Sequence, residues 1–402
     1  MPTSVTGAAS DSGKLLWRTA RAIAGGSALL TALACFDGEL RSGTVSTPIP
    51  LDTVPVVTLG GEGSLPLFGV VGATIVDGRI VVANGGSHKL HFYGMSGVLQ
   101  RIAGGQGEGP GEFQNLRWIQ ELNGHLFAFD LDLFRLSEFS ADGEFVGSVN
   151  IVPTEVFASA YPLGIFADGS ILVAASATVA ATFSRATTRR STASLLRYDA
   201  EGHYLDSIGS WTGTEIYGEP WGSAGHYMTE VPAGRKSALA VDGFDYYVVE
   251  DNDHSIQVYD TAGLKVRELR PAFPVAPVAI TAQMKAEFRD RRVAQIPSGV
   301  PIDIRDIVDR MPIPDTTPPY GWDGPHQLSM LRVSKGGTVW VLEYGGLVGT
   351  GPVWIVFAPD GSVRARITAE EHLDLLYAAG DVVLVRRWDD LDVETIEVRA
   401  LP

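Results

Sequence analysis

Short apolar runs separated by glycine turns repeat along most of the chain. Within these runs hydrophobic and polar residues alternate, and Val, Ile, Tyr, Phe and Trp are frequent, which favours β-strands over helices. Examples are RIVVA, KLHFY, HLFAF, SILVA, DYYVV, SIQVY, TVWVL and WIVF. The pattern therefore predicts an all-β domain built from many short strands.

A tight-turn signal recurs inside this pattern. Its glycines are Gly78, Gly124, Gly169, Gly243, Gly337 and Gly380. A second turn follows the first five of them, at Gly97, Gly143, Gly202, Gly263 and Gly361. Four antiparallel strands in a unit of about 45 residues, repeated around a ring, are typical of a β-propeller. The sequence thus predicts one six-bladed β-propeller with four-stranded antiparallel blades over residues 54–402.

Several segments carry a family resemblance. The stretch Asp251–Gly263, DNDHSIQVYDTAG, resembles the NHL-type repeat, and ANGGSHKLHFY from Ala83 to Tyr93 is a looser copy. The stretch Gly104–Phe113, GGQGEGPGEF, resembles the link that joins NHL blades, and TVWVLEYGG followed by WIVFAPDGSV resembles a late blade of secreted propellers related to NHL proteins. The resemblance implies a six-bladed propeller. It implies little about chemistry, because this scaffold hosts many functions.

The order of the strands predicts how the ring closes. The stretch Gly60–Gly69 repeats the pattern of Gly104–Phe113, so Val54–Leu59 takes the position of a fourth strand. The last unit, His372–Leu401, offers only three strands. We therefore expect the N-terminal strand to complete the last blade, which removes the exposed sheet edges of an open ring.

Strand order also predicts which face of the ring the insertions decorate. With the strands of a blade named a to d, the a–b and c–d turns lie on one face, the turn face. The b–c turns and the links between blades lie on the other, the insertion face. The glycine turns are short, whereas the extra length falls on the insertion face, at residues 175–190, 211–236, 271–325 and 344–351. Long loops on a rigid scaffold are common binding sites, so we expect a ligand here. The alternative is that the insertions pack on each other and cap the channel.

The longest insertion lies between the fourth and fifth blades and predicts a helix followed by an aromatic loop. Thr281 can cap a helix that runs to Ile296, before Pro297. Aromatic and histidine side chains of the insertions are candidate ligand-binding residues, since they can stack against a sugar, a peptide or an aromatic ligand. They are Trp211, Tyr217, Trp221, His226, Tyr227, Tyr320, Trp322 and His326. The alternative is that these side chains anchor the loops to the ring.

The N-terminal segment has the pattern of an export signal. Basic residues up to Arg21 precede an uncharged run from Ala22 to Ala34, which is too short to span a bilayer as a helix. Together with Cys35 the segment resembles a bacterial lipoprotein signal, in which the cysteine is acylated and becomes the first mature residue. We predict a signal peptide over residues 1–34, lipidation of Cys35 and a tether over residues 35–53. Ordinary cleavage before Cys35 and an uncleaved anchor are the alternatives.

Composition excludes several partners and cofactors. The chain has 402 residues and 47 acidic against 31 basic side chains, a formal net charge of −16, which opposes binding to nucleic acid. Its single cysteine excludes an internal disulfide and a cysteine-based zinc site. The nucleophile-elbow motif G-x-S-x-G and the zinc motif H-E-x-x-H are absent from the sequence.

Carboxylates gather at the b–c turns of alternate blades. They are Asp130, Asp132, Glu250, Asp251, Asp253, Asp389, Asp390 and Asp392. A calcium ion needs about 6–8 converging oxygen ligands, and these groups lie on separate blades. We expect solvated turn residues and no cofactor, with an acidic docking surface or a calcium site as alternatives.

These features together predict a binding module rather than an enzyme. The expected protein is exported, tethered by lipidated Cys35 on the periplasmic or cell-surface side, and binds a protein, peptide or glycan on its insertion face. An extrinsic subunit of a membrane complex would fit this description. No catalytic residue is predicted. The alternative is a metal-dependent propeller enzyme of lactonase or lyase type.

Overall fold

The computed structural model describes most of the chain that follows the predicted signal. The described residues are 47–61, 63–151, 159–176, 183–221, 225–250, 254–275, 277–294, 296, 303–321, 330–345, 347, 351–389 and 391–402. The predicted signal peptide, Cys35, Trp322 and His326 therefore lie outside the described residues. Within these segments, no helix combines the length and the apolar character that a membrane crossing requires.

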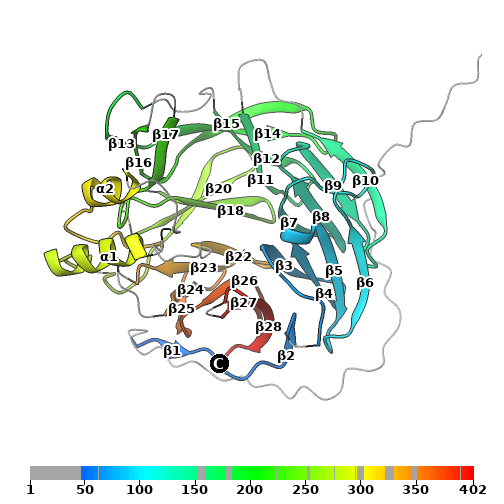
Figure 1. The fold of residues 1–402 in the computed structure, drawn as a ribbon. Coiled ribbons are helices and arrows are strands. Elements are labelled where there is room, and N and C mark those ends of the chain that lie inside the picture. The colour runs from blue at the N-terminus through cyan, green and yellow to red at the C-terminus, as the bar shows by residue number, and fades with distance from the viewer. Residues whose placement is uncertain are drawn as a thin grey trace, which may run out of the picture. The chain divides into compact units, whose positions relative to one another are not determined.

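Six antiparallel sheets carry most of the strands (Figure 1). The first three are β3 (Val70–Val76), β4 (Arg79–Asn84), β5 (Lys89–Gly94) and β6 (Leu99–Gly104); β7 (Leu116–Leu122), β8 (His125–Asp130), β9 (Arg135–Phe139) and β10 (Phe145–Asn150); and β11 (Ser159–Ile165), β12 (Ile171–Ser176), β14 (Thr192–Tyr198) and β15 (Tyr204–Thr212). The last three are β18 (Ala238–Asp242), β19 (Asp245–Val249), β20 (Ile256–Asp260) and β21 (Lys265–Leu269); β22 (Leu331–Ser334), β23 (Thr338–Glu343), β24 (Val353–Phe357) and β25 (Val363–Thr368); and β26 (Leu373–Ala379), β27 (Val382–Trp388), β28 (Glu394–Ala400) and β2 (Val57–Leu59).

The first strands of these sheets form a closed ring. They contact one another in the order β3, β7, β11, β18, β22, β26 and back to β3. Each neighbouring pair of sheets also shares one hydrophobic cluster, so apolar burial joins every sheet to the next around the ring. Figure 1 shows the first strands toward the middle and the fourth strands toward the outside. The chain is a β-propeller, and the prediction of four-stranded antiparallel blades is confirmed.

Two turn glycines show how closely the blades approach. Gly202 and Gly263 adopt φ of 83° and 79°, a left-handed conformation that glycine tolerates best. A Cβ atom at Gly202 would lie 2.2 Å from the carbonyl oxygen of Asn150 in the preceding blade. At Gly263 the corresponding distance to the oxygen of Ile208 is 1.9 Å. Both turns therefore need glycine for backbone conformation and for blade packing.

The N-terminal strand closes the ring as predicted. Strand β2 pairs antiparallel with β28, with Val57 opposite Val398. The segment before it is also ordered against the outer edge of the ring. Strand β1 (Ile49–Pro50) pairs parallel with β25, and Leu51 is 4% exposed in the cluster between the fifth and sixth blades. Residues 49–51, which fall in the predicted tether, thus join the propeller because an unpaired edge of β25 accepts them.

The closure gives a first testable prediction. Deleting residues 54–59 should lower the midpoint of thermal unfolding by on the order of 5–10 °C, because the last blade loses its fourth strand and exposes an edge. A deletion of equal length within residues 36–41 of the tether serves as the control and should leave the midpoint unchanged. Equal midpoints for the two deletions would disprove the closure.

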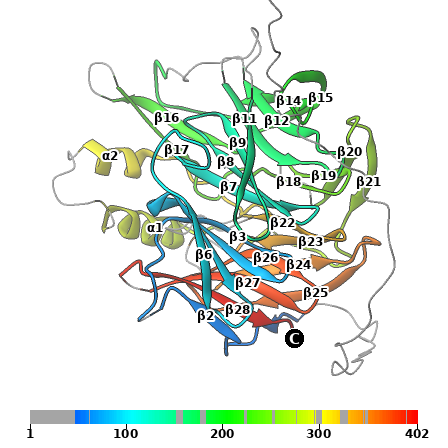
Figure 2. The ribbon, with the colours of Figure 1, turned by 90° about the vertical axis from the view of Figure 1, so that its right-hand side faces the viewer.

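The insertions fold into structure of their own. Helix α1 (Ala282–Ala294) forms where predicted, and the backbone N–H of Met284 donates to the capping Thr281 hydroxyl at 3.2 Å. A second helix, α2 (Asp303–Arg310), was not predicted. A three-stranded sheet of β13 (Thr187–Arg189), β16 (Ile216–Trp221) and β17 (Gly225–Glu230) was not predicted either. Figures 1 and 2 place both helices beside this sheet.

One carboxylate of the insertion face differs from its prediction. Asp130 is not a solvated turn residue, because its exposed fraction is 0%. The backbone N–H groups of Gln114 and Asn115 donate to its Oδ2 at 2.6 and 3.0 Å, and those of Asp132 and Leu133 donate to its Oδ1 at 3.0 and 2.9 Å. The link between the first two blades therefore folds over this side chain. Asp251, Asp253 and Asp390 lie outside the described residues.

Candidate functional sites

Four of the eight predicted ligand-binding residues of the insertion face lie in the hairpin β16–β17. Tyr217 is 3% exposed and packs with Ile307 and Val308 of α2, while Trp221 and Tyr227 pack against the same cluster and are half-buried. These side chains hold α2 on the hairpin. The two insertions therefore pack on each other.

A buried polar group reinforces this contact. The Tyr217 hydroxyl donates to Oε2 of Glu219, and Nη2 of Arg310 in α2 donates to Oε1 of Glu219 at 2.7 Å. Burial raises the pKa of Tyr217 to about 12, and the hydrogen bond to Glu219 adds to the effect. The hydroxyl therefore remains protonated near neutral pH and keeps its role as a donor.

The remaining candidates of the insertion face differ in exposure. Tyr320 is 1% exposed, and its hydroxyl donates to the carbonyl oxygen of His254 at 3.1 Å. Trp211 lies half-buried against the cluster between the third and fourth blades. His226 is exposed, and its ring centroid lies 6.5 Å from that of Phe183. A ligand role for this set remains a prediction, and among its described members His226 is the most accessible.

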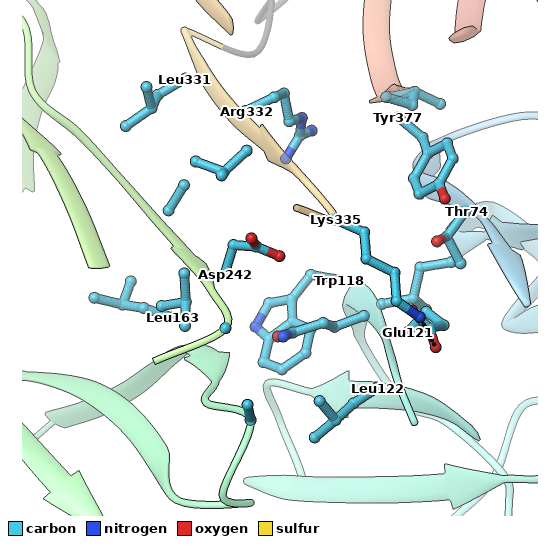
Figure 3. A pocket seen from close by; sticks show the side chains of 18 of the residues that line it. Thr74, Trp118, Glu121, Leu122, Leu163, Asp242, Leu331, Arg332, Lys335 and Tyr377 are labelled. Atoms are coloured by element: carbon cyan, nitrogen blue, oxygen red, sulfur yellow. Dashed lines mark hydrogen bonds and ion pairs between the residues drawn. The ribbon is translucent and has the colours of Figure 1, made fainter. Parts of the chain in front are cut away.

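A separate cavity of about 460 Å³ lies in the channel at the centre of the ring (Figure 3). All six first strands contribute to its wall, and its rim includes the a–b turn residues Asn123, Gly243 and Gly336. Its lining residues belong to the ring, not to α1, α2 or the sheet of β13, β16 and β17. The cavity therefore lies toward the turn face, opposite the face on which sequence reasoning placed the ligand.

Irregular strands aim large side chains into this cavity. The pairing register shifts between Leu116 and Trp118 in β7 and between Leu375 and Tyr377 in β26. A β-bulge of this kind re-aims the following side chains, and Trp118 and Tyr377 both line the cavity. The Trp118 indole N–H donates to the carbonyl oxygen of Pro162 at 2.9 Å, which fixes the ring against β11.

The cavity wall carries two acidic and two basic side chains. Nζ of Lys335 lies 3.3 Å from both carboxylate oxygens of Glu121, a pair that bridges the second and fifth blades at the turn face. Asp242 accepts hydrogen bonds from the backbone N–H groups of Gly337 and Gly336. Figure 3 shows Asp242 and Arg332 pointing into the same space.

Burial shifts the pKa values of both Asp242 and Arg332. It raises the pKa of Asp242 despite the two backbone donors, and it lowers the pKa of Arg332 despite the attraction of Asp374. Burial likewise raises the pKa of Tyr377, so its hydroxyl is a proton donor. Each charge is therefore less stable in the cavity than it would be in water.

The cavity was missed because its residues look like ordinary strand residues. Glu121, Asp242 and Arg332 stand inside or beside the apolar runs of first strands, where side chains alternate between the channel and the neighbouring blades. A charged residue within the apolar run of a first strand is the sequence signal that could have located the site.

The described segments contain no group of three or more His, Cys, Asp or Glu side chains that could hold a metal ion. Asp251, Asp253, Asp390 and His326 lie outside those segments.

Comparisons with known proteins assign no family. No protein-family model matches the chain. A search of curated proteins also finds no match. Matching solved structures include a DUF4221 family member from Bacteroides vulgatus, with 8% identity, a TM-score of 0.48 and coverage of 87% of this chain and 99% of that chain. Others are a gluconolactonase from Xanthomonas campestris (10% identity, TM-score 0.38, coverage 89% and 99%) and a calcium-binding regucalcin from Agrobacterium tumefaciens (12% identity, TM-score 0.39, coverage 88% and 97%). The propeller class of this chain rests on its own strand order and ring closure.

Proposed function

We propose that the protein is exported, tethered to a membrane through Cys35, and acts as a binding module whose insertion face recognises a protein, peptide or glycan. The observation that supports this most directly is the folded insertion. It has its own sheet, two helices and two hydrophobic clusters, whereas the described a–b and c–d turns on the turn face are short. Such added structure on one face of a ring exceeds what is needed to connect strands.

The outer side of the hairpin β16–β17 is the proposed contact surface. Its inner side packs on α2, so the hairpin is held in place before any partner binds. Met228 is 53% exposed and His226 is exposed on the same strand. A flexible, polarizable methionine next to a polar ring suits a peptide or protein surface. The NHL-type character of the blades, which rests on the resemblance of Asp251–Gly263, belongs to the same proposal.

Replacing His226 and Met228 together by alanine should weaken partner capture at least tenfold. Both side chains are accessible, so the midpoint of thermal unfolding should stay unchanged. The measurement is quantitative mass spectrometry after crosslinking and affinity purification of the full-length protein from native membranes. Leu264 at a c–d turn and Val266 in the following strand β21 are 66% and 51% exposed. Together they give a matched double alanine control that should keep the partner.

Two outcomes would contradict the proposal. Equal partner recovery with both double variants would remove the insertion face from recognition. Stoichiometric calcium or zinc in the purified protein, found by elemental analysis, would instead favour the metal-dependent enzyme of lactonase or lyase type.

A further inference from the structure

The channel cavity is lined by equal numbers of acidic and basic side chains. Its lining contains four ionisable groups of definite charge, the carboxylates of Glu121 and Asp242 and the cations of Arg332 and Lys335. Glu121 and Lys335 pair with each other at the turn face. Asp242 and Arg332 stand on the neighbouring first strands β18 and β22 and point into the interior (Figure 3). A ligand with a net charge would upset this balance.

The polar and apolar groups lie on different arcs of the ring. Hydrogen-bond donors follow one another on β22, β26 and β3, as Arg332, the Tyr377 hydroxyl and the Thr74 hydroxyl. Thr74 is 5% exposed, and its hydroxyl belongs to the wall of the cavity (Figure 3). A hydroxyl in this position can donate to an acceptor of a ligand. The opposite arc, on β7 and β11, presents Trp118 and Leu163.

We propose that this cavity binds a small zwitterion with an apolar body, the chemistry of a free apolar amino acid. Asp242 receives the ammonium group, Arg332 with Tyr377 and Thr74 receives the carboxylate, and Trp118 and Leu163 cover the apolar body. A cavity of about 460 Å³ lies within the range of small-ligand sites, about 300–1,000 Å³, and suits one such molecule.

The charges explain why both ends of the ligand matter. Arg332 is held in place by the carbonyl oxygen of Leu375, to which its Nε donates at 3.3 Å, and by the nearby charge of Asp374. A guanidinium held in this way has the planar geometry that suits a carboxylate. Burial destabilises the charges of both Asp242 and Arg332, and a ligand that supplies the opposite charge to each would relieve that cost. A molecule with only one charged end would stabilise the charge of only one of these two side chains.

Isothermal titration calorimetry of the purified protein with three probes tests this assignment. The probes share a phenyl ring on a short alkyl chain and differ in their charged groups. The probes are phenylalanine, phenethylamine, which lacks the carboxylate, and phenylpropionate, which lacks the ammonium. We expect phenylalanine to bind and each single-charge analogue to bind at least tenfold more weakly. Absence of phenylalanine binding at millimolar concentration, equal affinity for an analogue, or binding of glucose in its place would overturn the proposal.

Two variants locate the site. Asp242→Asn should weaken phenylalanine binding at least tenfold and leave phenylpropionate binding unchanged, because only the ammonium partner is lost. Lys265→Gln, an exposed substitution outside the cavity, is the matched control and should change phenylalanine binding less than threefold. An unchanged affinity in Asp242→Asn, or an equal loss for all three probes with an unchanged melting midpoint, would contradict the assignment. Partner capture by the insertion face is measured separately, so either proposal can fail alone.

Discussion

Replacing Arg399 with methionine should lower the free energy of unfolding by about 3–5 kcal/mol, among the largest effects of a single substitution in this chain. Arg399 is fully buried, with 0% exposure. Its Nε donates to Oε2 of Glu397 at 2.7 Å, and its Nη2 donates to Oε2 of Glu370 at 3.0 Å. Its Nη1 donates to the carbonyl oxygen of Asp52 at 3.0 Å. One guanidinium thus joins the last strand, the link before the last blade and the N-terminal segment.

The large effect comes from the partner that stays behind. Glu397 is 5% exposed, and without Arg399 its nearest described cation is Arg387, whose Nη1 lies 3.9 Å from Oε1. A buried carboxylate with so weak a partner is costly, whereas removing both charges is often nearly neutral. The double variant Arg399→Met with Glu397→Gln should therefore recover part of the lost stability.

Chemical unfolding of the full chain measures both effects. Arg101→Met provides the matched control, because Arg101 and Glu144 form an ion pair whose side chains are 39% and 65% exposed. An exposed pair of this kind contributes about 0–1 kcal/mol. If Arg399→Met cost no more than Arg101→Met, the buried group would not hold the closure of the ring.

The blades could be predicted because their signals are local. Each hairpin joins two alternating apolar runs through a turn of a few residues, and the glycines of those turns adopt positive φ, as Gly78 and Gly124 do at 72° and 81°. The closure was predictable because Gly60–Gly69 repeats a link pattern seen elsewhere in the chain. Helix α1 was predictable from its Thr281 cap and the following proline.

The rest depends on contacts between distant segments. Helix α2 has only eight residues, and isolated helices that short are marginal without packing. It is stabilised by Tyr217, which belongs to another insertion. Strand β13 likewise forms only by pairing with β16. Sequence patterns do not show such partners, and an aromatic loop residue can be a ligand contact or an anchor until its packing is known.

The site in the channel cavity could not be predicted from the sequence for the same reason. Asp242 and Arg332 come from different blades, and neither lies in a recognisable motif. Their juxtaposition follows from the closed order of the first strands, and the aim of Trp118 and Tyr377 follows from bulges in their strands. Sequence reasoning therefore favoured the face with long loops, where composition is unusual, over the face with short turns.

Replacing Asp130 with alanine should lower the free energy of unfolding by about 3 kcal/mol, because hydrogen bonds to a charged acceptor contribute about 1.5–3 kcal/mol each and part of the loss is recovered by water. Four backbone N–H groups donate to its carboxylate, two from the link at Gln114 and Asn115 and two from the turn at Asp132 and Leu133. Alanine leaves all four without this acceptor.

Hydrogen exchange of the full chain should locate the Asp130→Ala effect as well as size it. The amides of Gln114, Asn115 and Leu133 should exchange faster, because they lose their acceptor, while amides of distant blades change only with global stability. Asp132→Ala is the matched control, since the Asp132 carboxylate accepts only the exposed Asn115 side-chain amide, at 3.0 Å, among the described contacts. It should cost about 0.5 kcal/mol or less. Similar losses for the two variants would mean that the charge of the turn, rather than its buried acceptor, stabilises the link between the first two blades.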